Sequence, residues 1–237
     1  MRLPTPIDLQ QLALHLGGQR QPGQPLLIGI TGSVAVGKST LAAALVESLV
    51  GLRVDTVATD GFLLPNTALD AAGLTLRKGF PESFDAAGFA TTIAALRHGP
   101  APVPGYSHQI YDIDPALTRQ VGPADILIIE GLGLAPHAGA NPAAALDLLL
   151  YLDADEADLE RWFVARFIGF WHAAAKDPTS FYARFRDLTP AAAEMFARSV
   201  WTNINLPNLR DHISGARDTA DIVVKKGPDH GLILVRA

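Results

Sequence analysis

Residues 32–40 combine two glycines, a lysine and a hydroxyl in the order of a phosphate-binding loop. They match the pattern G-x-x-x-x-G-K-[ST] without a mismatch, and they are Gly32, Ser33, Val34, Ala35, Val36, Gly37, Lys38, Ser39 and Thr40. Glycines adopt positive φ and let backbone amides approach a phosphate closely. In this pattern Lys38 would neutralise the β- and γ-phosphates of ATP, and Ser39 would bind Mg²⁺. The loop therefore predicts binding of a nucleoside triphosphate.

Two acidic residues stand directly after segments with the composition of buried strands. Asp60 follows residues 53–59, and Glu130 follows the apolar run 126–129. Because the carboxyl ends of parallel strands meet at one edge of a sheet, we expect both acids beside the phosphate loop. Asp60 could orient or deprotonate an attacking hydroxyl there, or it could only cap a turn. Glu130 could hold Mg²⁺ or its water, or it could accept a backbone hydrogen bond.

The segments around these residues alternate between strand and helix patterns. Residues 26–30 predict a strand and 41–49 a helix, so the next strand, at 53–59, should return parallel to the first and pair with it. Residues 62–85 are aperiodic and predict a long functional loop. Further strands are expected at 125–130, 148–152, 221–225 and 232–235, and helices at 85–97, 155–170 and 190–204. The predicted fold class is α/β, with a doubly wound, mainly parallel sheet that carries the P-loop.

The composition limits the classes of partner. The 237-residue chain has 49% apolar residues, a net charge of −5 and no cysteine. These values disfavour nucleic acid as the main partner and exclude disulfides and thiolate metal sites. No apolar run reaches the length of a membrane span, and the N-terminus lacks the pattern of a secretion signal. We expect a cytoplasmic protein that binds neither membrane nor nucleic acid.

Five further sequence blocks accompany the loop in a fixed order. They are TDGFLLPN at 59–66, RKGFPESF at 77–84, YSHQIYD at 106–112, IEGL at 129–132 and WTNINLPNL at 201–209. Together with the loop GSVAVGKST, they resemble the signature blocks of the bacterial type I pantothenate kinases, which are P-loop kinases related to phosphoribulokinase and uridine kinase. The resemblance extends from about residue 27 to the C-terminus.

The resemblance implies an enzyme that uses ATP and Mg²⁺ to phosphorylate the primary hydroxyl of pantothenate in coenzyme A synthesis. It implies a kinase domain over residues 26–237 with a helical lid at about 155–190, and a homodimer. The loosely helical spacing of apolar residues at 7–16 and the Gly/Pro/Gln-rich stretch that follows predict a short helix and linker over residues 1–25. The implied catalytic residues are Asp60, Lys38 and Arg166. Ser39 and Glu130 would hold the metal. The implied acceptor-binding residues are Tyr106, His108, Phe163, Phe167, Phe170 and Asn205.

Several positions depart from the family pattern. Phe163 replaces a tyrosine that contacts pantothenate in the family, although the spacing of Phe163, Phe167 and Phe170 also fits the core face of a helix. Ala43 replaces a basic residue linked to feedback by coenzyme A, so we expect weak feedback. The segment before the loop is shorter than in the family. These departures leave open a kinase for another small alcohol, such as glycerate, a nucleoside or a sugar, or an ATP-binding regulator without turnover.

Overall fold

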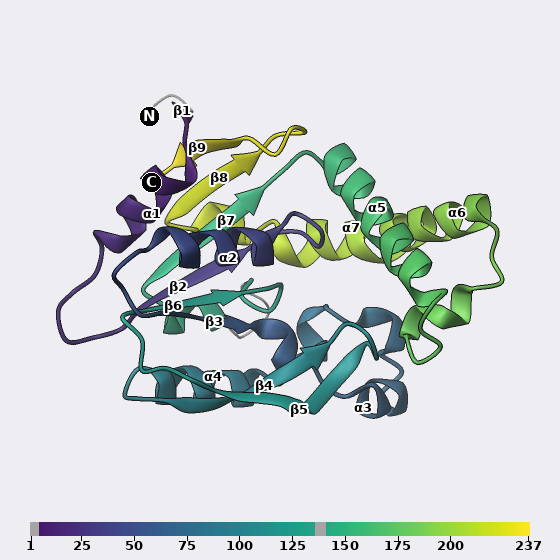
Figure 1. Ribbon diagram of the computed structural model, residues 1–237, viewed down its shortest axis with the longest axis horizontal. Helices are drawn as coiled ribbons and strands as arrows, with labels where there is room; N and C mark the ends of the chain where they lie inside the picture. Colours follow the sequence, from purple (N-terminus) through teal and green to yellow (C-terminus); the bar gives the residue numbers. More distant parts are fainter. Residues whose placement is uncertain (1–4, 136–140) are drawn as a thin grey trace.

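A seven-stranded sheet with the order β1-β9-β8-β7-β2-β6-β3 forms the centre of the molecule (Figure 1). The computed structural model describes residues 5–135 and 141–237. The strands of this sheet are β1 (Thr5–Pro6), β2 (Leu26–Thr31), β3 (Val54–Ala58), β6 (Ile126–Glu130), β7 (Leu148–Asp153), β8 (Ile222–Lys226) and β9 (Leu232–Arg236). β3, β6, β2, β7 and β8 run parallel. At one edge β9 pairs antiparallel with β8, and β1 pairs antiparallel with β9. The predicted mainly parallel α/β sheet is confirmed.

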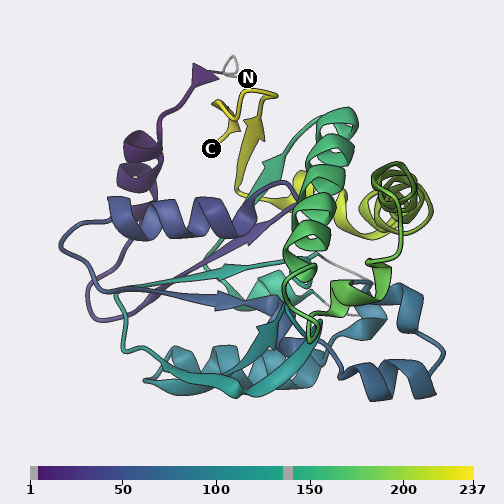
Figure 2. The same ribbon diagram turned by 45° about the vertical axis from the view of Figure 1, so that its right-hand side comes forward.

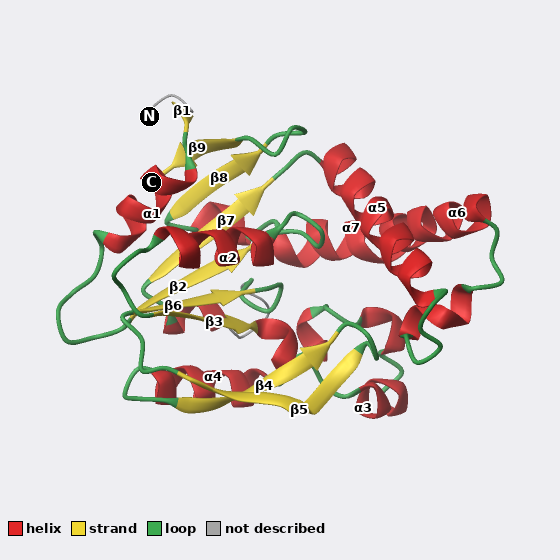
Figure 3. Cartoon of the chain, in the orientation of Figure 1, coloured by secondary structure: helices red, strands yellow, loops and turns green. Residues whose placement is uncertain are grey.

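Helices cover both faces of the sheet, which is why its central strands are apolar along their length. Every residue of β2 is buried, as are the four apolar residues of β6. α2 (Lys38–Ser48) lies in front of the sheet and α7 (Leu206–Asn208) behind it, as Figure 3 shows by element type. The remaining helices are α1 (Leu9–Gly17), α3 (Asn66–Ala71), α4 (Ala86–Leu96), α5 (Glu156–Ala174), α6 (Pro190–Val200) and α8 (Ala216–Thr219). None of the helices in the described ranges is both long and apolar enough to cross a membrane.

The pairing expected between the first two strands of the P-loop unit is wrong. β2 and β3 are parallel, but β6 lies between them: Leu26 and Val54 both pair with Ile126. The crossover through α2 fixes the direction of the returning strand, but it does not fix how many strands lie between. The carboxyl ends of all three strands still meet at one edge of the sheet.

Two segments contain structure that the sequence patterns did not predict. The expected loop at 62–85 contains α3 and two 3₁₀ turns. Residues 101–121 form a separate antiparallel hairpin of β4 (Ala101–Ser107) and β5 (Asp112–Val121), in which the register shifts between Val103 and Gly105. Pro102 and Pro104 obscure the strand pattern, yet a two-stranded ribbon with open edges tolerates proline.

α5 and α6 form an arm that projects beyond the carboxyl ends of the strands. In Figure 1 the arrowheads of β2, β6 and β7 point toward this arm, and Figure 2 shows α6 nearly end-on beside α5. A 3₁₀ turn, η5 (Phe181–Phe185), joins the two helices. The arm has a small core of its own around Phe167, Ala193 and Ala197. It therefore extends the sheet edge that carries the phosphate loop.

Candidate active site

The phosphate loop connects the end of β2 to the start of α2. Gly32 and Gly37 have φ values of +144° and +101°, and a Cβ on Gly32 would lie 2.3 Å from the carbonyl oxygen of Leu152. Lys38 Nζ donates hydrogen bonds to the carbonyls of Gly32 (3.2 Å) and Ser33 (2.8 Å), which closes the loop on itself. The N-terminus of the 11-residue α2 then points into the loop, as an anion site requires.

A hydroxyl and a carboxylate meet at the first turn of α2. Ser39 Oγ donates to Glu130 Oε1 at 2.9 Å, although 91 residues separate them. Next to this pair, Thr31 Oγ1 donates to the carbonyl of Gly131 at 3.0 Å, which ties the end of β2 to the end of β6. No cluster of three or more acidic or histidine side chains suited to a metal occurs in the described part of the chain. Magnesium needs only one or two protein oxygens beside substrate phosphates and water, so Ser39 and Glu130 fit it.

Asp60 reaches the same edge of the sheet from the turn after β3. The turn is η1 (Thr59–Phe62), and Gly61 within it packs so closely on β4 that a Cβ would lie 2.2 Å from the carbonyl oxygen of Pro104. Burial lowers the pKa of Lys38, whereas Glu130 and Asp60 raise it. Burial raises the pKa of Glu130, and Lys38 and the hydrogen bond from Ser39 oppose this shift. The structure thus brings both predicted acids close to the loop lysine.

Arg166 extends from α5 toward this group of charges. Among the residues that the structure describes, no carboxylate lies within ion-pair distance of its guanidinium, which instead sits 5.4 Å from the centre of the Phe170 ring. Arg166 contributes to the pKa of Lys38 and Glu130, which places it within electrostatic range of both. Within the described ranges it is therefore a cation without an ion-pair partner that lies in electrostatic range of the loop lysine.

Aromatic side chains form a wall beside Asp60 and Arg166. The Tyr106 ring lies 5.2 Å from His108, and His108 stacks on Phe170 with 6.3 Å between ring centres. Burial lowers the pKa of His108, while Asp60 raises it and Arg166 lowers it. The structure therefore gathers three of the predicted acceptor-binding residues, Tyr106, His108 and Phe170, around the catalytic groups.

The other three predicted acceptor-binding residues have different surroundings. Asn205 ends a π-helical turn (Trp201–Asn205), and its buried Nδ2 finds no hydrogen-bond acceptor among the described residues. Phe163 lies 6.0 Å from Trp201, and Phe167 packs among the rings of the arm, so both side chains belong to cores. π-helical turns and orphaned polar groups are common at functional sites, which supports Asn205 more than the two phenylalanines.

Lys78 is a site residue that the sequence analysis missed. Its side chain is 6% exposed, and its Nζ donates to Asn66 Oδ1 (2.6 Å) and to the carbonyl of Tyr111 (2.7 Å). It also lies 5.0 Å from the Tyr106 ring centre and 4.7 Å from that of Tyr111. Burial lowers its pKa, and Asp112 and Asp60 raise it. The sequence offered one indication of a role for Lys78, its position in the signature block RKGFPESF at 77–84.

A second missed group lies on the opposite side of the phosphate loop. Lys226 Nζ donates to the carbonyl of Val36 at 2.8 Å and lies 4.2 Å from the Trp162 ring centre. Trp162 in turn stacks on His230, with 5.2 Å between ring centres and 29° between planes. The positions of these three residues along the chain do not predict that they are neighbours. They come together only because β8 (Lys226), the turn after it (His230) and α5 (Trp162) are adjacent in the fold.

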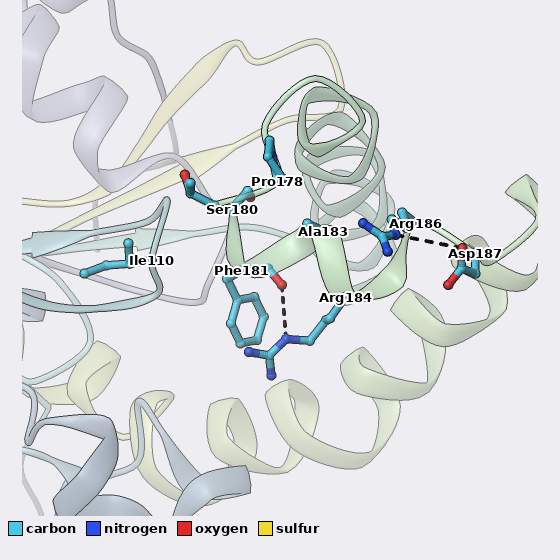
Figure 4. Close-up of a pocket in the computed structure, with 9 residues that line it drawn as sticks. Ile110, Pro178, Ser180, Phe181, Ala183, Arg184, Arg186 and Asp187 are labelled. Carbon is cyan, nitrogen blue, oxygen red and sulfur yellow. Dashed lines mark hydrogen bonds and ion pairs between the residues drawn. The ribbon is translucent and has the colours of Figure 1, made fainter.

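Two cavities border the arm without containing Asp60 or Lys38. The larger, about 450 Å³, lies between η5 and the turn of the β4–β5 hairpin, where Ile110 faces Phe181 (Figure 4). The smaller, about 260 Å³, lies behind the phosphate loop and is bordered by Ser33, whose buried Oγ has no partner among the described residues. Neither cavity includes the charged groups that meet at the edge of the sheet.

A glycine loop between strand and helix, a lysine held within it and acids on two neighbouring strands define a P-loop phosphotransferase. The model of the phosphoribulokinase / uridine kinase family matches residues 27–163. The pantothenate kinase of Parvibaculum lavamentivorans is 43% identical over 94% of this chain and 73% of its own length. The pantothenate kinase of Sorangium cellulosum is also 43% identical, over 88% of this chain and 71% of its own length.

A solved structure extends the similarity over most of both chains. It is described as a "putative fructose transport system kinase" from a Silicibacter species, is 27% identical and has a TM-score of 0.73 over 90% of this chain and 95% of that one. The present chain belongs to the phosphoribulokinase / uridine kinase family. It is an ATP-dependent phosphotransferase with a pantothenate kinase-like function, which confirms the resemblance found in the signature blocks.

Proposed function

We propose that this enzyme transfers the γ-phosphoryl group of ATP to the primary hydroxyl of pantothenate and forms 4'-phosphopantothenate. The observation that carries the proposal is the convergence of Lys38, Glu130, Asp60 and Arg166 at one sheet edge, facing the wall of Tyr106 and His108. The similarity to enzymes named pantothenate kinase supports the choice of acceptor.

In this proposal the chain positions the reactants and neutralises charge. The loop amides and Lys38 hold the β- and γ-phosphates, and Arg166, which has no carboxylate partner in the described ranges, stabilises charge on the transferring group. Asp60 accepts the proton of the acceptor hydroxyl while the hydroxyl oxygen forms a bond to the γ-phosphorus. The bond to the bridging oxygen breaks, and ADP leaves. Bound Mg²⁺, held by Ser39 and Glu130, would offset the negative charge of the phosphates.

The surface of Trp162, His230 and Lys226 suits the nucleobase of ATP. It borders the phosphate loop through the hydrogen bond from Lys226 to Val36 and offers stacked rings beside a cation. A planar heterocycle gains both stacking and cation–π attraction on such a surface. On the other side of the loop, Tyr106, His108, Phe170 and Asn205 would contact the acceptor, with Lys78 fixing the two tyrosine rings.

A second candidate acceptor is a small sugar or polyol. The Silicibacter kinase, which is described as a putative fructose transport system kinase, matches 90% of this chain and 95% of its own. Phe163 also lacks a hydroxyl at a position expected to contact pantothenate. ADP release measured with pantothenate, fructose, glycerate and uridine at equal concentrations tests the two candidates. Stimulation by pantothenate alone supports the first; stimulation by fructose without pantothenate supports the second.

Three expectations from the sequence stay predictions about the same enzyme. The arm of α5, η5 and α6 is the proposed lid over the acceptor, a homodimer is the expected assembly, and the cytoplasm, where ATP is available, is the expected location. Light scattering on the purified protein measures the assembly directly. A monomeric mass would contradict the expected dimer without affecting the proposed reaction.

A further inference from the structure

The η5 turn is attached to the β4–β5 hairpin by several contacts. The amide of Phe181 donates to the carbonyl of Gln109 at 2.7 Å, and Gln109 Nε2 donates to Asp177 Oδ2 (2.8 Å) and Thr179 Oγ1 (3.1 Å). The Tyr111 ring stacks on Phe181 with 4.4 Å between centres. Figure 4 shows Phe181 of η5 and Ile110 of the hairpin, which both line the larger cavity at this junction. These contacts fix the position of the next residue, Tyr182.

Tyr182 turns its ring toward the acceptor wall. The ring stacks on Phe170, with 5.0 Å between centres and 28° between planes, and meets Phe167 edge-on at 5.7 Å. Phe170 also contacts His108 and Arg166. Only the Phe170 ring therefore lies between Tyr182 and two groups of the proposed reaction centre, His108 and Arg166.

The hydroxyl of Tyr182 has no hydrogen-bond acceptor among the residues that the structure describes. The other polar group of the same aromatic cluster, Trp171 Nε1, is satisfied because it donates to the carbonyl of Phe185 at 2.8 Å. A half-buried phenol normally finds a partner. The Tyr182 hydroxyl is thus free to bind a ligand or water.

Two other phenols lie near both Tyr182 and the proposed catalytic base. After burial, which has the largest effect, Asp60 and Tyr182 each raise the pKa of Tyr106 and of Tyr111. Burial also raises the pKa of Tyr182, so its hydroxyl is a neutral donor at physiological pH. Ring contacts connect Tyr106 to His108, His108 to Phe170 and Phe170 to Tyr182, so an acceptor that extends from Asp60 along this wall is directed toward Tyr182.

We propose that Tyr182 determines acceptor specificity by donating a hydrogen bond to the carboxylate at the end of pantothenate remote from the phosphorylated hydroxyl. This inference rests on the proposed function. Phe163 offers no hydrogen bond to the acceptor, and the rings that contact Tyr182 on the arm, Phe167, Phe170 and Phe181, are apolar. The phenol is therefore a polar group in a part of the wall that is formed by apolar rings. The buried Nδ2 of Asn205 is a second donor without a partner in the described ranges, and two donors suit an anion.

The variant Tyr182→Phe tests this inference because it removes one oxygen and keeps the ring packing. The probes are pantothenate and N-propylpantoamide, which carries a methyl group in place of the carboxylate. Loss of one charge-assisted hydrogen bond should raise KM for pantothenate about tenfold, with kcat and KM for ATP within about twofold of wild type. KM for N-propylpantoamide should change by less than about twofold, since it has no carboxylate to bind.

The matched control is Tyr151→Phe, which removes a phenol oxygen from the buried strand β7 and should leave both acceptor constants unchanged. An unchanged KM for pantothenate in Tyr182→Phe overturns the inference. An equal rise for both acceptors overturns it as well, because the residue would then act through packing. If the wild-type enzyme does not phosphorylate pantothenate, both the proposed function and this inference fail; if it does, the variant decides the inference alone.

Discussion

Ser39 Oγ and Glu130 Oε1 lie 2.9 Å apart, which joins the first turn of α2 to the end of β6. The two residues come from opposite ends of a long stretch of chain, yet they place two oxygen ligands beside the phosphate loop. The hydrogen bond fixes the position of the carboxylate, which in the proposed function would hold a magnesium ion together with Ser39.

Replacing Glu130 by glutamine should weaken metal binding while keeping a hydrogen-bond acceptor for Ser39. We expect the Mg²⁺ concentration for half-maximal activity to rise about tenfold or more, because a neutral amide is a poorer ligand for a hard cation. Titrating activity with Mg²⁺ at saturating ATP measures this. An unchanged titration curve would remove Glu130 from the metal site.

The same variant should change how stability depends on pH. Burial raises the pKa of Glu130, so the folded protein holds this proton more tightly than the unfolded chain does. The free energy of unfolding contributed by this group therefore falls as pH rises from about 4.5 through the raised pKa. Thermal melting of both proteins between pH 4.5 and 7.5 should show wild type losing stability relative to Glu130→Gln. The opposite trend would mean that Glu130 is stabilised as a carboxylate.

Asp60→Asn should separate ATP binding from turnover. An amide cannot accept the proton of the acceptor hydroxyl, so kcat should fall at least about 100-fold. The dissociation constant for ATP, measured by calorimetry, should stay within a few-fold of wild type because the loop is intact. Near-normal turnover would show that Asp60 only caps its turn.

Arg166→Gln should reduce activity without reducing stability. Loss of one cation at the transferring phosphoryl group should lower kcat by about 100-fold or more. The melting temperature should hardly change, because Arg166 has no carboxylate partner in the described ranges. Arg198→Gln is the matched control: it breaks exposed ion pairs with Glu160 and Glu194, which contribute little, and should keep full activity. Equal kinetic effects of both substitutions would argue against a special role for Arg166.

Gly131→Ala should destabilise the fold at the edge of the sheet. Gly131 has φ +148°, and a Cβ there would lie 1.8 Å from Thr59 Oγ1. Strain and overpacking together should lower the free energy of unfolding by about 3 kcal/mol or more. Gly51→Ala is the control, because Gly51 has φ +82° but no atom within 4 Å of the added methyl. Denaturant unfolding should show a cost of only about 1–2 kcal/mol there. An equal loss in the free energy of unfolding for both variants would mean that the Thr59 side chain moves away and accommodates the added methyl group.

The sequence predicted the parts of the site that depend on local patterns. The phosphate loop has a fixed spacing, and an apolar run ending in an acid, as at Glu130, is typical of a central parallel strand. Asp60 could be placed at the same edge because parallel strands end together. These arguments hold even though β6 lies between β2 and β3, since an inserted parallel strand keeps both ends on one side.

The parts that escaped prediction depend on contacts between distant segments. Lys78 lies buried beside the Tyr106 ring because Asn66 and the carbonyl of Tyr111 accept its hydrogen bonds, and no local pattern encodes those partners. Tyr182 lies beside the acceptor wall because its ring stacks on Phe170 and because η5 is attached to the hairpin. The hairpin itself was missed because its prolines break the alternation by which strands are recognised.

The most direct test of the account is the product formed from pantothenate and ATP. Purified wild-type enzyme with Mg²⁺ should release ADP only when pantothenate is present, in a one-to-one ratio with 4'-phosphopantothenate identified by mass spectrometry. Asp60→Asn should form both products at least about 100-fold more slowly. ADP release that pantothenate does not stimulate, together with stimulation by fructose or glycerate, would contradict the proposed acceptor.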